Sequence, residues 1–142
     1  MTLKAAVFAV GFLAAAPLAN AAEPVSAAAT VVAHHMAVSG TRNIDAVLED
    51  YADDAIVVTP DGVGRGKADL RRMFELVFSR QAPSASPSAP PTMLKQAFVD
   101  NVGQVIWAQN AGKPDEVVGV ETYIVRDGKI QVQTVALTPV HP

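Results

Sequence analysis

A four-residue segment, Arg126-Asp127-Gly128-Lys129, constrains the fold of this chain more than any other feature. It separates two runs rich in β-branched residues, 117–125 and 129–138. Asp-Gly between two such runs is a strong signal for a type I′ hairpin turn, because both central residues of that turn have positive φ. The sequence therefore predicts an antiparallel hairpin in which Val125 lies opposite Ile130.

The register of this hairpin assigns each residue to one face of a sheet, because opposed residues share a face and side chains alternate along a strand. Continued without interruption, the register sets Tyr123 opposite Val132 and Glu121 opposite Thr134. One face then carries Gly119, Glu121, Tyr123, Val125, Ile130, Val132, Thr134 and Ala136, and the other carries Val120, Thr122, Ile124, Gln131, Gln133 and Val135. The first face is the more apolar, so we expect it to face the protein interior.

Further strands are predicted on both sides of a proline- and serine-rich segment. Residues 55–59 are β-branched and stop at a Pro60-Asp61-Gly62 turn, while 92–100 and 104–110 alternate with period two. Residues 82–91 between them have no periodicity, and we expect an exposed, extended loop there.

Three segments favour helices, at 25–38, 44–50 and about 67–80. The third has the clearest apolar stripe, at the spacing of one helix face: Leu70, Met73, Phe74, Val77 and Phe78. The second sets Ile44, Val47 and Leu48 on one face and Asp45, Glu49 and Asp50 on the opposite, polar face. Helices followed by a run of antiparallel strands indicate an α+β domain.

Residues 1–21 are typical of a secretory signal peptide, with Lys4 before an apolar run and Ala19-Asn20-Ala21 as the cleavage site. We therefore expect the mature chain to comprise residues 22–142, one domain, and to be exported to the periplasm or secreted. The apolar run is shorter than the ~20 residues that span a bilayer, so no stable membrane insertion is expected.

Several strings of the mature chain, in this order, resemble a bacterial branch of the nuclear transport factor 2-like (SnoaL-like) superfamily. They are His34-His35-Met36-Ala37, Asp50-Tyr51-Ala52-Asp53-Asp54-Ala55, Thr59-Pro60-Asp61-Gly62, Arg65-Gly66, Trp107, Glu121-Thr122-Tyr123 and Arg126-Asp127-Gly128-Lys129-Ile130 through Gln133-Thr134. The resemblance implies a cone-shaped α+β fold, with N-terminal helices packed on a strongly curved sheet around a pocket, and a homodimer formed through the sheet. Members include ketosteroid isomerases, polyketide cyclases, dehydratases and many domains of unknown role, so function depends on the site.

Glu121 is the first candidate catalytic residue, because the predicted register directs its carboxylate into an apolar cone. Burial raises the pKa of a carboxyl group, which brings a glutamate toward the range useful for proton abstraction. His34 and His35 are candidate partners in acid–base chemistry, and since neighbours on a helix point about 100° apart, at most one of them faces the pocket squarely. A solvated or ion-paired Glu121 and a histidine that only packs in the helix are the structural alternatives.

Four further residues are candidates for ligand contact. Tyr51, Trp107 and Tyr123 combine apolar rings with one polar tip, which suits the wall of a pocket, and Thr134 shares the predicted face of Glu121.

Composition excludes several function classes. The chain has no cysteine, so thiolate catalysis and sulfur-ligated zinc or iron–sulfur sites are excluded, and adjacent histidines cannot chelate a metal from one helix face. Its net charge of −3 does not suit a nucleic-acid surface. The segment 62–67 resembles a phosphate-binding loop, but Asp61 and Ala68 stand where a Walker A motif needs Gly and Ser or Thr. We expect no cofactor and no metal.

The sequence leaves three functions open. The first is an exported domain that binds a small apolar or amphipathic molecule in its cone. The second is a proton-transfer enzyme, an isomerase, cyclase or dehydratase, that uses Glu121 with His34 or His35. The third is an interaction domain whose cone is filled by its own side chains.

Overall fold

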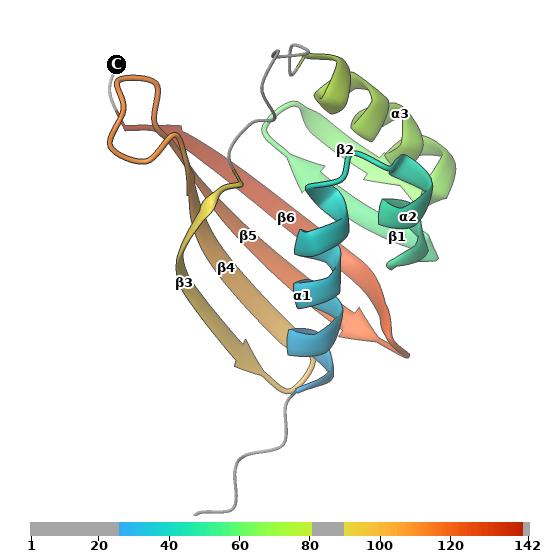
Figure 1. Cartoon of the computed structure of the whole chain (residues 1–142). Helices are drawn as coiled ribbons and strands as arrows, with labels where there is room; N and C mark the ends of the chain where they lie inside the picture. The colour runs from blue at the N-terminus through green and yellow to red at the C-terminus, as the bar shows by residue number, and fades with distance from the viewer. Residues whose placement is uncertain (1–25, 81–89, 141–142) are drawn as a thin grey trace, which may run out of the picture.

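The computed structural model describes residues 26–80 and 90–140, which form three helices and one six-stranded sheet (Figure 1). The helices are α1 (Ala27–Ser39), α2 (Ile44–Glu49) and α3 (Gly66–Arg80). The strands are β1 (Tyr51–Thr59), β2 (Gly62–Arg65), β3 (Thr92–Val99), β4 (Val102–Gln109), β5 (Val117–Arg126) and β6 (Lys129–Pro139). This confirms the predicted α+β class. The predicted signal peptide at 1–21 and the loop at 82–91, except its last two residues, lie outside the described residues.

The sheet has the order β2-β1-β6-β5-β4-β3 and is open at both edges. Strands β1 and β6 run parallel, and all other neighbours run antiparallel. The strands curve around α1, which lies across β3, β4 and β5, while α3 covers β1 and β2 (Figure 1). We call the sheet face that α1 covers the inner face and the opposite one the outer face.

Local sequence explains where the first two helices begin. The Ser26 side chain accepts a hydrogen bond from the Ala29 amide at 3.0 Å, and the Asn43 side chain accepts one from the Ala46 amide at 3.2 Å. Both are N-caps, which satisfy amides that have no partner inside the helix. The helix starts are therefore set by polar side chains just outside the apolar segments.

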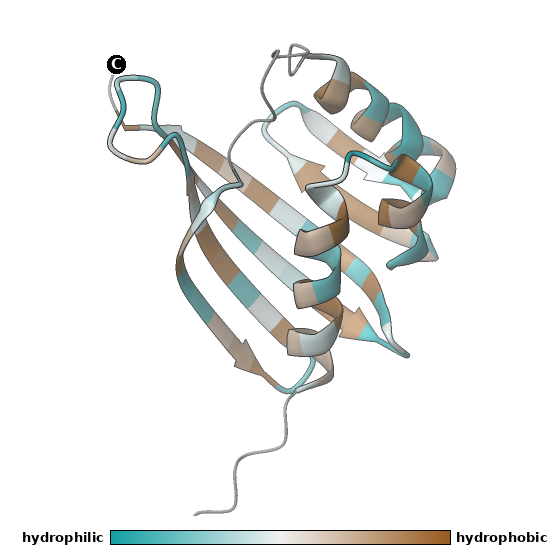
Figure 2. Ribbon diagram, viewed as in Figure 1, coloured by the Kyte–Doolittle hydropathy of each residue, from teal (hydrophilic) through white to brown (hydrophobic). Residues whose placement is uncertain are grey.

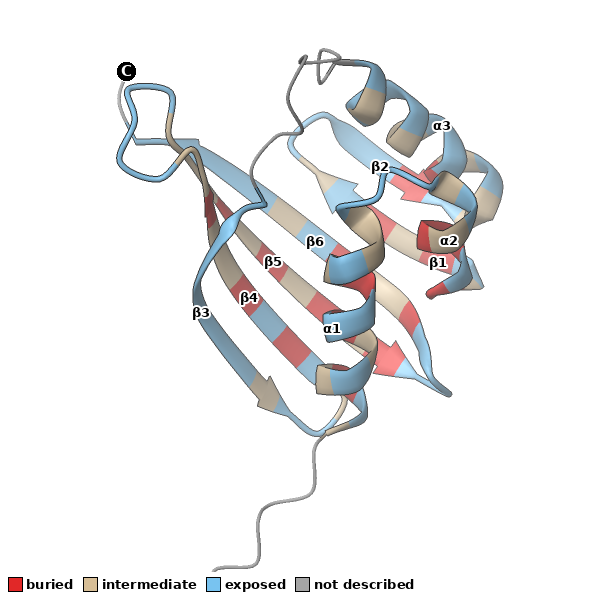
Figure 3. Ribbon diagram, viewed as in Figure 1, coloured by how far each residue is buried: buried red, intermediate tan, exposed pale blue. Residues whose placement is uncertain are grey.

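The core lies between the helices and the inner face. Hydrophobic and polar residues alternate in bands along the strands (Figure 2), and the buried positions of β4 and β5 lie beneath α1 (Figure 3). The largest fully buried side chains are Tyr51, Tyr123, Leu70, Ile130, Val32, Val47, Val105 and Val125. Two of the eight are tyrosines, so the core contains hydroxyl groups that need partners.

The predicted hairpin turn is confirmed, but its register is correct only near the turn. Asp127 and Gly128 have φ of 50° and 70°, and Val125 pairs with Ile130 as predicted. The next residue of β5, Ile124, pairs with Val132, so Gln131 of β6 has no opposite partner. This extra residue is a β-bulge. Beyond the bulge every residue of β6 lies on the face opposite to the predicted one.

Three other differences from the sequence-based expectations are found. β1 begins at Tyr51 rather than residue 55, and Gly62 to Arg65, for which no strand was predicted, form β2, which pairs with β1. Two glycines in four residues hide this strand from a β-propensity pattern. Val77, predicted in the apolar stripe of α3, is 43% exposed, so the buried face of the helix is narrower than the stripe predicts.

Candidate functional site

On the inner face of β5 lies a carboxylate that accepts hydrogen bonds from three neighbouring side chains. Glu121 is only 9% exposed, and its Oε1 accepts a hydrogen bond from Trp107 Nε1 at 2.9 Å. Its Oε2 accepts one from Gln133 Nε2 at 3.0 Å and another from the Tyr123 hydroxyl. All three donors are neutral, and the described residues place no lysine, arginine or histidine within ion-pair distance of Glu121. The carboxylate is therefore stabilised by dipoles and not by a directly bound cation.

Both tyrosines remain donors over the physiological pH range. Burial, and after it the negative charge of Glu121, raises the pKa of Tyr51 and of Tyr123 well above the ordinary value of 10.0. The Tyr51 hydroxyl donates to Gln133 Oε1, so the side-chain amide of Gln133 links Tyr51 to Glu121. The two phenolic groups thus act as fixed O–H dipoles around the carboxylate.

His35 continues this chain of contacts on the far side of Tyr51. Its Nε2 lies 3.3 Å from the Tyr51 hydroxyl, and its ring meets the rings of Tyr51 and Tyr123 edge-on, at centroid distances of 5.2 and 5.7 Å. The residue is 3% exposed. His35 is therefore a core histidine with the Tyr51 hydroxyl as the polar neighbour of its Nε2.

Asp50 lies between the two adjacent histidines. Its Oδ1 is 2.8 Å from His34 Nδ1, and its Oδ2 is 3.5 Å from His35 Nδ1. Burial acts to raise the pKa of Asp50, but the interactions with His35 and His34 outweigh it, so the pKa lies below its ordinary value of 3.8. The His34 side chain is 59% exposed, so it connects Asp50 and His35 to solvent.

We call these residues together the Glu121 cluster: His34, His35, Asp50, Tyr51, Trp107, Glu121, Tyr123 and Gln133. They come from α1, from the end of α2, and from β1, β4, β5 and β6. Apart from His34 and Trp107, all of them are buried. One connected polar group thus crosses the core from the surface of α1 to the inner face of β4.

Gly119 gives Trp107 its position. The two residues are opposed across β4 and β5, and a Cβ atom at position 119 would lie 2.3 Å from Cε2 and Cζ2 of the indole ring. Since such a contact is impossible without movement, the ring lies flat over the glycine backbone. This places the indole N–H against Glu121.

The structure brings together six of the seven predicted site residues. Glu121, Tyr51, Trp107, Tyr123 and His35 are in direct or one-step contact, and His34 joins them through Asp50. Thr134 is exposed, and the prediction that it shares a face with Glu121 is wrong. The bulge in β6 turns Thr134 to the outer face and sets Val135 opposite Glu121.

Sequence reasoning missed Asp50 and Gln133. Asp50 was predicted on the polar face of the second helix, but the helix ends at Glu49, and the chain turns Asp50 toward α1 with 8% exposure. Gln133 was predicted on the outer face, and the same bulge that removes Thr134 brings it inside. The Asp-Tyr pair directly after a helix is the one signal that could have drawn attention to Asp50.

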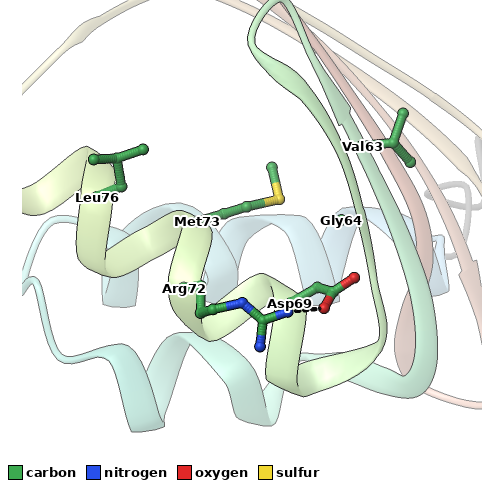
Figure 4. A pocket seen from close by; sticks show the side chains of 6 residues that line it. All are labelled: Val63, Gly64, Asp69, Arg72, Met73 and Leu76. Atoms are coloured by element: carbon green, nitrogen blue, oxygen red, sulfur yellow. Dashed lines mark hydrogen bonds and ion pairs between the residues drawn. The ribbon is translucent and has the colours of Figure 1, made fainter.

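A hollow lies away from the Glu121 cluster. It is a shallow groove of about 290 Å³ between β2 and α3, lined by Val63, Gly64, Asp69, Arg72, Met73 and Leu76 (Figure 4). Asp69 and Arg72 form an ion pair at its edge, and Val63 and Leu76 are 55% and 49% exposed. No buried polar group points into this groove, so we assign no chemistry to it.

The described part of the chain contains no group of three or more metal-ligating side chains. Within residues 26–80 and 90–140, no helix has the length and apolar character that a membrane span requires.

Comparison with known proteins gives one family and many structural neighbours. A model of the SnoaL-like domain matches residues 32–133. No curated protein matches the chain. A protein from Kribbella flavida DSM 17836, provisionally assigned as a ketosteroid isomerase, superposes with a TM-score of 0.63 at 16% identity, over 82% of this chain and 81% of that one.

Two further neighbours are similar to the same degree. A provisionally assigned polyketide cyclase from Sinorhizobium meliloti has a TM-score of 0.60 at 18% identity, over 75% of this chain and 94% of that one. An NTF-2 like protein of unknown function from Burkholderia xenovorans LB400 has a TM-score of 0.61 at 17% identity, over 82% of this chain and 86% of that one. At these identities the likeness establishes the shared fold alone.

Proposed function

This chain belongs to the family of SnoaL-like domains, and we propose that it is an exported protein that binds a small amphipathic molecule beside Glu121 and Trp107. The observation that carries the proposal is the concentration of polar side chains in the core. Burying a polar group costs free energy unless it is fully partnered, and apolar residues of the same volume are often as stabilising. A purely structural core of this size has no need of a buried carboxylate that no cation contacts directly.

The geometry of Glu121 suggests which chemical group the ligand carries. Oε1 accepts a hydrogen bond from Trp107 only, whereas Oε2 accepts two. A carboxylate oxygen can accept two hydrogen bonds, so Oε1 retains one acceptor position. An O–H or N–H donor of a ligand fits that position, and the half-buried indole of Trp107 offers an apolar surface to the rest of the molecule.

The test uses the indole N–H signal of Trp107, which is unique because the chain has one tryptophan. In ¹H–¹⁵N spectra, we expect 2-naphthol to shift this signal more strongly than naphthalene, which lacks the hydroxyl. Glu121→Leu should abolish the difference between the two probes. Thr134→Val also replaces a polar side chain by an apolar one of similar shape, but on the outer face, and should leave the difference between the two probes intact. No shift with 2-naphthol, or equal shifts with both probes, would contradict the proposal.

A second candidate function is proton transfer with Glu121 as the base. The contact between Glu121 and Tyr123 favours it, because a carboxylate beside a phenol that stays protonated can remove a proton while the phenol stabilises developing negative charge. The provisional assignments of two neighbours as an isomerase and a cyclase agree with this chemistry. The measurement is exchange of the α-hydrogens of 2-tetralone for deuterium in D₂O, which Glu121→Gln should slow by at least tenfold.

We also propose that two copies associate through the outer face of the sheet. That face carries a row of half-buried apolar residues that no helix among the described residues covers: Ile106, Val118, Val120, Ile124 and Val132. Val135, which the predicted register placed there, lies on the inner face instead. A partner sheet of the same chain would bury the row.

A further inference from the structure

The hydrogen bonds of the Glu121 cluster have a fixed direction. A carboxylate only accepts, so Gln133 must present its N–H₂ to Glu121 and therefore its Oε1 to Tyr51. Tyr51 has a single hydroxyl proton, which it donates to that Oε1. The Tyr51 oxygen can then only accept from His35 Nε2, so His35 carries a proton on Nε2.

The other ring nitrogen of His35 faces a carboxylate. His35 Nδ1 and Asp50 Oδ2 are 3.5 Å apart, both are buried, and neither has a hydrogen-bond partner among the described residues. An unprotonated Nδ1 would set two buried lone pairs against each other, which costs free energy. A proton on Nδ1 replaces this repulsion by an attraction between opposite charges.

We propose that His35, held by Asp50, is a positioning residue that carries both ring protons while Glu121 is ionised. The arrangement offsets part of the negative charge in the core, because one imidazolium then lies between two buried carboxylates. Among the described residues, no lysine or arginine forms an ion pair with Asp50 or Glu121. The titratable and polar groups around His35 are His34 on α1, Asp50 at the end of α2, Tyr51 on β1, Glu121 and Tyr123 on β5 and the neutral Gln133 on β6.

The same side chains can form hydrogen bonds that run in the opposite direction, from Glu121 to His35, when Glu121 takes up a proton. Glu121 then donates to Gln133 Oε1, the amide turns over and donates to Tyr51, and Tyr51 donates to His35 Nε2, which has lost its proton. The number of protons in the chain is unchanged, since Glu121 gains one proton and His35 releases one to water. Trp107 and Tyr123 donate to the carboxyl group in both directions. His35 is thus the charge counterpart of Glu121, although the two side chains do not touch.

The inference extends the proton-transfer candidate, but its test needs no ligand, so the two can fail separately. In the mature protein labelled with ¹⁵N-histidine, two-bond ¹H–¹⁵N spectra at neutral pH should show His35 protonated at both nitrogens. In Glu121→Gln, whose amide can donate toward Gln133, we expect His35 to lose this signature and to become a neutral Nδ1–H tautomer. His34 contacts the same Asp50 but lies outside the chain to Glu121, and its spectrum should not change.

A second variant covers the case in which Glu121→Gln fails to fold. Tyr51→Phe interrupts the chain between His35 and Gln133 and should also return His35 to the neutral form. Assignment of the signals comes from His35→Asn. A singly protonated His35 in the wild-type protein, or a doubly protonated His35 that persists in both variants, would overturn the inference.

Discussion

Tyr51→Phe tests whether the Glu121 cluster is one connected unit. The substitution removes a single oxygen from a residue with no solvent exposure, so apolar burial and packing are almost unchanged. It leaves Gln133 Oε1 without a donor and His35 Nε2 without its neighbour. A buried polar group left without a hydrogen-bond partner costs about 1–3 kcal/mol, and two such groups are affected, so we expect Tyr51→Phe to lower the free energy of unfolding by about 2–4 kcal/mol. That is a large share of the stability of a small domain.

The assay is urea unfolding followed by the fluorescence of Trp107, which is half-buried and is the chain's one tryptophan. For a domain of this size, the expected loss lowers the urea midpoint by about 1–3 M at an unchanged slope. The matched variant is Gln133→Met, which replaces the amide by an apolar chain of similar length. In that background Tyr51→Phe should cost at least about 1 kcal/mol less, because the oxygen it would orphan is already gone. A loss below about 0.5 kcal/mol, or additive effects of the two changes, would refute the reasoning.

Four other outcomes are expected. Asp50→Asn should destabilise the protein above about pH 5, and the deficit should vanish in acid, because the pKa of Asp50 is lowered on folding and its contribution is lost as pH falls through that pKa; urea midpoints against pH test this. Gly119→Ala should displace the Trp107 ring and shift its emission and indole N–H signal while the far-UV circular dichroism is retained, and unchanged spectra would contradict the packing argument. Protein from the periplasmic or extracellular fraction of the native host should have the intact mass of a chain beginning at Ala22, whereas full-length chain in the cytoplasm would count against export. Light scattering should give a dimer mass that Ile124→Lys reduces to a monomer, and a monomeric wild type at micromolar concentration would remove the dimer proposal.

The elements of the fold were largely predictable because their signals are local. The first two helices begin at capping side chains, the third has an apolar stripe, and Asp127-Gly128 formed the predicted turn. β2 was missed because a strand of four residues with two glycines exists only through its pairing with β1. That pairing is a tertiary effect, which propensity cannot report.

The site was predictable only in part, for a related reason. Glu121 and Tyr123 are on the strand whose register the turn fixes, and they share one face as predicted, whereas the position of Trp107 depends on the pairing of β4 with β5, which the sequence did not predict. Gln133 and Thr134 lie beyond the bulge, where the turn no longer determines the register. No residue type at the bulge marks it, so the inward position of Gln133 could be found only from the structure.

The bulge in β6 also affects how this scaffold can change over evolutionary time. Because the bulge leaves one residue of β6 without an opposite partner, loss of the bulge at constant chain length would leave the turn in place and shift the pairing of everything beyond it by one residue. Gln133 and Val135 would move to the outer face, and Val132 and Thr134 would replace them opposite Tyr123 and Glu121. A substitution at the bulge that made the strand regular would thus exchange an amide for a hydroxyl in the core, although a position-by-position comparison of relatives would find Gln133 and Thr134 unchanged.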